Sequence, residues 1–354
     1  MTYLYLTLLA VAAFILSFIF YTYVKDALRL SLRDNYKKFM FLPLVAVFMP
    51  LLMALPPLTD NFRDTLFLPS LELSAIVLLS ALLIGCSDFI KYKNVLRVLM
   101  CLSCAGACVY MLPEDYRIYN MDTFTTDEKL IVWGLWSLLA IGYPILGASA
   151  GLEHIHTIMI MLAFCLFYAL SIVPMYMLGA AILMIAFVMP IFMIEMSENE
   201  KIFNTTAMSV MGFIFGWISV VCAGGEGILL PTEIMLTYLE VEVAFWVFKR
   251  LIMREKSYKT MMYFHDLLPM DNTERMMYAC VRTESLLIIL ALMQVYSIQS
   301  QALPIFAVFA VLWAMGKLGA SRKNQSLSEI NKEFVADLKK GISEVTDVFG
   351  NKKK

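Results

Sequence analysis

The chain is a succession of long apolar stretches separated by short polar segments. A helix that crosses the hydrocarbon core of a bilayer needs about 20 predominantly apolar residues. By that length the pattern predicts an all-α, polytopic membrane helix bundle of about 10–11 transmembrane helices. The first stretch lacks a charged leader and is too long for a cleavable signal, so we expect it to remain as an anchor. The eleven predicted spans are 2–24, 39–58, 67–87, 95–112, 129–148, 155–172, 174–194, 206–224, 227–248, 284–299 and 301–317.

The pattern changes after residue 320. Apolar residues then recur every three or four positions, which is the period of an amphipathic helix. Ser326 and Glu329 fit a capping box at its start. We therefore expect a transmembrane bundle over 1–320 and a cytoplasmic amphipathic tail over 321–354. Two interpretations of the tail stay open: it binds a membrane surface or a partner, or it folds back on the loops of its own chain.

Composition supports a membrane protein. Hydrophobic residues make up 60% of the chain and charged residues 16%, whereas soluble domains carry about 25% charged residues. The net charge of -1 by itself says nothing about nucleic-acid binding. We expect no nucleic-acid partner, and the position of the charges becomes more informative than their sum.

The basic residues are strongly clustered. All but Arg63, Arg117 and Lys129 of the 28 Lys and Arg residues fall in five groups. The apolar stretches alternate so that the five groups share one side of the membrane, and cytoplasmic loops are the ones enriched in Lys and Arg. With an odd number of spans, the N-terminus is then outside and the C-terminus in the cytoplasm. The groups cover 25–38, 91–97, 201, 249–282 and 317–354.

Four segments on that basic side carry the candidate chemistry. The third span ends in Cys86-Ser87-Asp88, followed by Lys91-Tyr92-Lys93. The fifth runs into the segment Gly147-Ala148-Ser149-Ala150-Gly151-Leu152-Glu153-His154. The eighth is preceded by Lys201-Ile202-Phe203-Asn204-Thr205-Thr206, and the largest polar segment contains Met262-Tyr263-Phe264-His265.

This order of segments resembles the polyprenyl-phosphate N-acetylhexosamine-1-phosphate transferases, membrane enzymes that begin the assembly of cell-envelope polysaccharides. The resemblance covers roughly 1–320. In that family the matching segments carry a paired Asp, an Asp-rich loop, a Lys-Ile-Phe loop with a metal-binding Asp, and a His cluster. The resemblance implies Asp88, Glu153 and His265 as catalytic candidates and Asp88 as a metal ligand. It implies Lys37, Lys38 and Lys201 as ligands of the substrate phosphates.

The chain departs from the family at the metal positions. Ser87 stands where the first Asp of the pair is expected and Thr206 where the metal-binding Asp is expected, while one His remains of the cluster. Magnesium is usually held by one or two carboxylates together with phosphates and waters, and a neutral hydroxyl does not replace that charge. We therefore expect a catalytically degenerate protein that binds lipid or a partner, with Mg²⁺ as cofactor only in an active form.

Two alternatives stay open. One is an active, altered transferase that uses Asp88, Glu153 and an acidic residue from 195–200. The other is a transporter or assembly-scaffold subunit. The resemblance implies a bacterial cytoplasmic membrane, with polyprenyl phosphate, a nucleotide sugar, a second copy of the chain or an envelope-assembly protein as partners.

The remaining polar residues have simpler interpretations from the sequence. Asp88 alone is also consistent with a solvated helix cap beside Lys91 and Lys93. The two histidines at 154 and 156 point to different faces of a helix and are expected to be ordinary interfacial residues. The carboxylates at 195, 198 and 200 are expected on a solvated loop.

Overall fold

The computed structural model describes residues 2–55, 71–90, 93–112, 116, 125–147, 151–198, 201–252, 273–296 and 302–320. The amphipathic tail predicted over 321–354 and the candidate His265 lie outside the described residues.

Every regular element of the described residues is a helix. The order is α1 (Thr2–Ile19), α2 (Lys25–Leu32), α3 (Met49–Met53), α4 (Leu71–Cys86), α5 (Lys93–Tyr110), α6 (Thr126–Leu146), α7 (Leu152–Ala169), α8 (Met175–Glu198), α9 (Thr205–Gly216), α10 (Ala223–Gly225), α11 (Leu229–Ile252), α12 (Thr273–Tyr296) and α13 (Leu303–Ala320). Short π-helical segments over 20–24, 44–48 and 217–222 continue α1 into α2, lead into α3 and join α9 to α10.

Seven of these helical runs are long and apolar enough to cross a membrane, and three shorter apolar helices accompany them. The long runs are Tyr3–Leu32, Asn35–Met53, Thr126–Leu146, Leu152–Ala169, Met175–Glu198, Thr205–Gly225 and Met277–Tyr296. The protein is therefore an all-α, polytopic membrane helix bundle, as the apolar pattern predicts. Two helices differ from their predicted bounds in a way that matters: α7 begins three residues earlier and α8 ends four residues later than expected.

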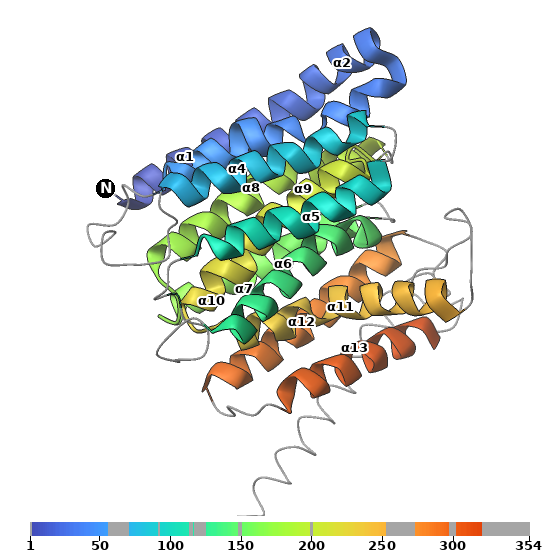
Figure 1. Cartoon of the computed structure of the whole chain (residues 1–354). Helices are drawn as coiled ribbons and strands as arrows, with labels where there is room; N and C mark the ends of the chain where they lie inside the picture. Colours follow the sequence, from blue (N-terminus) through green and yellow to red (C-terminus); the bar gives the residue numbers. More distant parts are fainter. Residues whose placement is uncertain are drawn as a thin grey trace, which may run out of the picture.

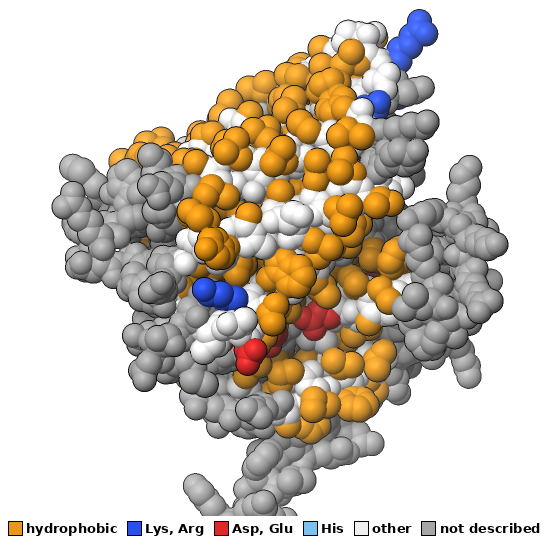
Figure 2. Space-filling model, in the orientation of Figure 1, with side chains coloured by type: hydrophobic (Ala, Val, Ile, Leu, Met, Phe, Trp, Pro, Cys, Tyr) orange, Lys and Arg blue, Asp and Glu red, His pale blue; other side chains and the backbone are white. Residues whose placement is uncertain are grey.

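The exterior of the bundle is apolar. Figure 2 shows hydrophobic side chains covering the face formed by α1, α4 and α5, with Lys and Arg at the upper edge near α2. Large apolar side chains on this face are well exposed, for example Leu8 at 59%, Leu79 at 55% and Leu99 at 54%. Such a continuous apolar face marks a membrane or interaction surface, and here it faces the lipid.

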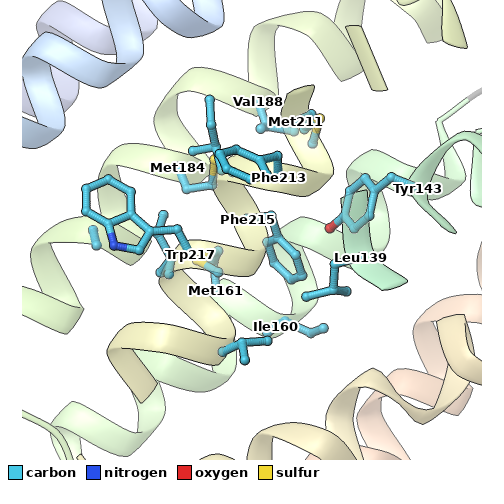
Figure 3. Packing of buried hydrophobic residues seen from close by; sticks show 14 of the residues in the cluster. Leu139, Tyr143, Ile160, Met161, Met184, Val188, Met211, Phe213, Phe215 and Trp217 are labelled. Carbon is cyan, nitrogen blue, oxygen red and sulfur yellow. The ribbon is translucent and has the colours of Figure 1, made fainter. Parts of the chain in front are cut away.

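The helix α9 and its continuation form the centre of the bundle (Figure 1). Residues 206–224 of the run Thr205–Gly225 are all buried within the protein, with α4, α5 and α6 packed against α9. Figure 3 shows Phe213 and Phe215 of this run among side chains of α6, α7 and α8. Trp136 of α6 stacks on Phe213 and donates a hydrogen bond from Nε1 to its carbonyl oxygen at 2.7 Å.

Two glycines bring α9 and α6 into close contact. A Cβ atom added at Gly212 would lie 2.5 Å from the carbonyl oxygen of Leu139, and one at Gly216 would lie 2.6 Å from Cδ1 of Trp136. Small residues four positions apart allow helix backbones to approach closely in membranes. This pairing fixes the position of α9, whose first turn lies at the candidate site.

Candidate functional site

Helix ends meet at one end of the bundle, which we call the basic end. It is formed by the segment 33–39, the end of α4, the start of α5, the end of α6, the start of α7, the end of α8 and the loop 201–204. Lys37, Arg97 and Lys201 lie there, whereas Lys129 lies in the first turn of α6 at the other end.

The loop 201–204 is held in place by hydrogen bonds to its backbone. Oε1 of Glu195 accepts from the backbone N–H of Ile202 at 2.7 Å and of Phe203 at 3.3 Å. Asn204 is the N-cap of α9, and its Oδ1 accepts from the N–H of Ala207 at 2.8 Å. Asn is among the preferred N-cap residues because its side chain satisfies a free N–H of the first turn. The loop is therefore a fixed wall of the site.

Two lysines connect this loop to neighbouring segments. Nζ of Lys201 donates to the carbonyl oxygen of Gly147 at the end of α6, and Nζ of Lys37 donates to the carbonyl oxygen of Lys201 at 3.1 Å. Gly147 also packs closely against α9, because a Cβ there would lie 2.3 Å from Sδ of Met208 and would require that flexible side chain to shift. Three segments far apart in the sequence thus converge around Lys201.

Asp88 joins the same group of residues. It lies in the single 3₁₀ turn after α4 and is only 7% exposed. Nδ2 of Asn204 donates to its Oδ2, so this carboxylate supports the cap of α9. The expectation of a solvated helix cap at Asp88 is wrong, because the turn folds under the loop rather than into solvent.

A pocket of about 500 Å³ opens at this end. Its polar lining consists of three cations, Lys37, Arg97 and Lys201, together with Asn94, Asn204 and Thr205. The first turn of α9 points into it, and the N-terminal N–H groups of a helix favour anions. No carboxylate is among the described residues that line it. The electrostatics favour a phosphate or another polyanion.

The remaining lining of the pocket is apolar. It consists of Val98, Ile141, Pro144, Ile145, Gly147, Phe203, Met208 and Trp246. Val98 is 36% exposed, and its neighbours on α5, Val95 and Leu99, are 65% and 54% exposed on the apolar outer face. The pocket therefore lies next to lipid on the α5 side, which suits a ligand with an anionic head and an apolar tail.

The Lys201 side chain is partly desolvated. Burial lowers the pKa of Lys201 below its ordinary value of 10.5, and Glu153 and Glu195 act in the opposite direction. The two carboxylates behind the pocket thus offset part, but not all, of the effect of burial on this cation.

Those two carboxylates belong to a second, deeper cluster. Gly151, with φ of 82°, is the N-cap residue of α7, and Glu153 and His154 lie in the first turn of that helix. Glu195 lies in the last turn of α8. All three side chains have no exposed surface. The expectations of an interfacial His154 and a solvated Glu195 are wrong for this reason. His156 is likewise buried, with Nδ1 against Oε1 of Glu284 on α12.

Magnesium does not fit the positions that the family resemblance assigns to it. Asp88 is the one carboxylate there, and it already accepts a hydrogen bond from Asn204. The hydroxyls of Ser87 and Thr206 are buried without a hydrogen-bond partner. Mg²⁺ is usually held by one or two carboxylates together with phosphates and waters in near-octahedral geometry. Here the one carboxylate is already engaged by Asn204, and the two hydroxyls beside it are neutral.

The structure brings most of the sequence candidates together. Lys37 and Lys201 line the pocket, while Asp88 and Glu153 lie behind its wall at Asn204 and Lys201. Lys38 is not among the lining residues. Arg97 and Asn94 also line the pocket, and neither was predicted from the sequence. Their spacing of three puts them on one face at the start of α5, and an Arg near an apolar span is a functional signal in membranes.

No protein-family model matches the chain, and a search of curated proteins finds no match.

Proposed function

We propose that this protein binds a phosphate-bearing polyprenyl lipid in the basic pocket and is a catalytically degenerate relative of the polyprenyl-phosphate sugar-1-phosphate transferases. The observation that carries the proposal is the grouping of Lys37, Arg97 and Lys201 with the N-terminus of α9 in a pocket whose described lining has no carboxylate. When a phosphoryl group is transferred between two phosphates, positive charge must offset the negative charge that develops. In this pocket the three fixed cations supply positive charge that would bind a phosphate.

The position of the pocket supports a lipid rather than a soluble phosphate compound. Its apolar wall continues to the exposed side chains Val95 and Leu99 on the lipid-facing side of α5. A polyprenyl chain lying along α5 would place its phosphate at the three cations. On this proposal the basic end faces the cytoplasm of a bacterial cell, because cytoplasmic loops retain Lys and Arg.

The loss of transfer is supported by the residues at the metal positions. Ser87 and Thr206 carry no charge, and the carboxylate of Asp88 supports the cap of α9. Purified protein incubated with a radiolabelled UDP-sugar, undecaprenyl phosphate and Mg²⁺ is expected to give no lipid-linked product. Robust magnesium-dependent product would contradict degeneracy and favour the active alternative, in which Asp88→Asn abolishes turnover.

Binding is tested with two lipids that differ only in charge. Purified protein in nanodiscs is titrated with undecaprenyl phosphate and with neutral undecaprenol, and we expect affinity for the phosphate alone. Arg97→Gln is expected to weaken phosphate binding by about tenfold or more, since a hydrogen bond to a charged group contributes about 1.5–3 kcal/mol.

Lys38→Gln is the matched control, because Lys38 adjoins Lys37 in the chain without lining the pocket. It removes the same charge from the same end of the bundle and is expected to leave the affinity unchanged. Equal weakening by both variants, or equal binding of the two lipids, would contradict a specific phosphate site and would favour a transporter or scaffold role.

A further inference from the structure

The cluster behind the pocket contains buried polar atoms that the protein itself does not satisfy. Both carboxylate oxygens of Glu153, both ring nitrogens of His154 and Oε2 of Glu195 are buried with no hydrogen-bond partner. Buried polar groups are satisfied in the great majority of cases, so each exception requires an explanation. Nε2 of His154 and Oε2 of Glu195 form an ion pair at 3.2 Å if the imidazole is protonated, while the two oxygens of Glu153 and Nδ1 of His154 have no hydrogen-bond partner. The three adjoining side chains therefore offer free ligand atoms that one ion could share.

The geometry of the cluster matches a metal coordination sphere. Nε2 of His154 lies 3.2 Å from Oε2 of Glu195 and 3.9 Å from Oε1 of Glu153, and one ligand atom from each residue falls within 4.8 Å of the others. With metal–ligand distances of about 2.0–2.2 Å, the ligand atoms of a tetrahedral site lie about 3.3 Å apart. The side chains are thus spaced to share one ion.

We propose that Glu153, His154 and Glu195 bind a divalent transition-metal ion of the zinc type. The imidazole nitrogen favours zinc, copper, iron or nickel over magnesium, which takes oxygen ligands. Two carboxylates and a neutral imidazole around a dication give a neutral buried site. This site is distinct from the magnesium positions of the resemblance and does not depend on the proposed lipid.

The surrounding residues orient these ligands. Oε1 of Glu195 accepts the two N–H bonds from the loop 201–204, which leaves Oε2 directed at His154. The ring of Phe203 packs edge-on to His154 with centroids 5.6 Å apart. Hydrogen bonds that orient a ligating carboxylate, such as those from the loop 201–204 to Glu195, are a regular part of metal sites. The ion would join the first turn of α7 to the last turn of α8 beneath the pocket wall.

The competing explanation is a metal-free cluster in which a protonated His154 and Lys201 balance the two carboxylates. The two are distinguished by metal content. Full-length protein purified in detergent is stripped with chelator, reloaded with Zn²⁺ and desalted, and its metal is measured by mass spectrometry. We expect about one equivalent per chain, falling about tenfold or more in Glu195→Gln.

Glu284→Gln is the matched control. It also removes one buried carboxylate that contacts a histidine, but the pair His156–Glu284 lies outside the cluster. It is expected to retain the metal. Wild-type protein without zinc after reloading, or equal loss in both variants, overturns the assignment. Should Glu195→Gln fail to fold, X-ray absorption of the wild-type protein decides: imidazole and oxygen neighbours at about 2.0–2.2 Å support the site, and their absence overturns it.

Discussion

Lys201 has two roles at the site. Its side chain holds the end of α6 through the carbonyl oxygen of Gly147, and its ammonium group contributes to the positive lining of the pocket. Burial lowers its pKa from the ordinary 10.5. Since desolvation penalises the charged form, this lysine loses its proton at a lower pH than a solvated one.

The pH dependence of lipid binding follows from that shift. A phosphate monoester is fully ionised well above pH 6, so any loss of binding at alkaline pH comes from the protein. The protonated lysine binds the anion, and binding should therefore weaken as pH rises through the lowered pKa of Lys201, below 10.5. Titration with undecaprenyl phosphate across this range checks it. Lys201→Arg keeps its charge and should remove this part of the loss; an unchanged profile would assign the titration to another group.

The sequence predicted which end of the bundle holds the polar residues of the site, but it did not predict how deeply they are buried. Asp88, Glu153, Lys37 and Lys201 were all expected at one side of the membrane, and they lie at one end of the bundle. The burial of Glu195 was not predictable from hydropathy, because hydropathy gives the length of an apolar run but not which helix covers its last turn.

At the scale of elements, α9 and α6 form the rigid pair on which the site depends. The close contacts at Gly212 and Gly216 set the axial position of α9 and hence of its cap at Asn204. The sequence indicated both glycines as part of the eighth span, but their partner helix followed only from the structure. Helix pairing depends on the shapes of two helix surfaces, and the sequence of one span describes only one of them.

Gly212→Ala is expected to destabilise the bundle. The added methyl would meet the carbonyl oxygen of Leu139, which is backbone and has no rotamer to move away. Overpacking of this kind costs about 1–3 kcal/mol, measured as a lower midpoint of thermal unfolding in detergent.

Gly134→Ala on α6 provides the control, because nothing lies within 4 Å of its added Cβ. In an exposed helix position Ala is favoured over Gly, so this variant should be neutral or slightly stabilising. Equal destabilisation by the two changes would contradict the close packing of α9 on α6.

At the scale of the whole molecule, the alternation of helices separates the two ends by charge. The segment with Lys37 and Lys38 and the loop with Lys201 lie at the basic end, and Lys129 lies at the other. The long apolar runs made this arrangement predictable, since backbone polar groups must be satisfied within helices in lipid. The pocket was not predictable in the same way, since it arises where several helix ends meet.

Orientation in the membrane is tested by labelling single cysteines in intact cells. Cys86 is the exposed native cysteine among the described residues and is first replaced by Ser. A cysteine at Lys129 is expected to react with a membrane-impermeant maleimide added outside, and one at Lys38 only after permeabilisation. The reverse result would place the basic pocket outside the cell and remove the cytoplasmic lipid from consideration.

The burial of residues 206–224 at the centre of the bundle also has a consequence for biogenesis. Helices α4, α5 and α6 are synthesised before α9. Until α9 is inserted, the surfaces of these helices that pack against it have no protein partner. Truncated chains that end before residue 205 would expose these surfaces to lipid. Quality-control proteases should therefore degrade them faster than chains that end after residue 225.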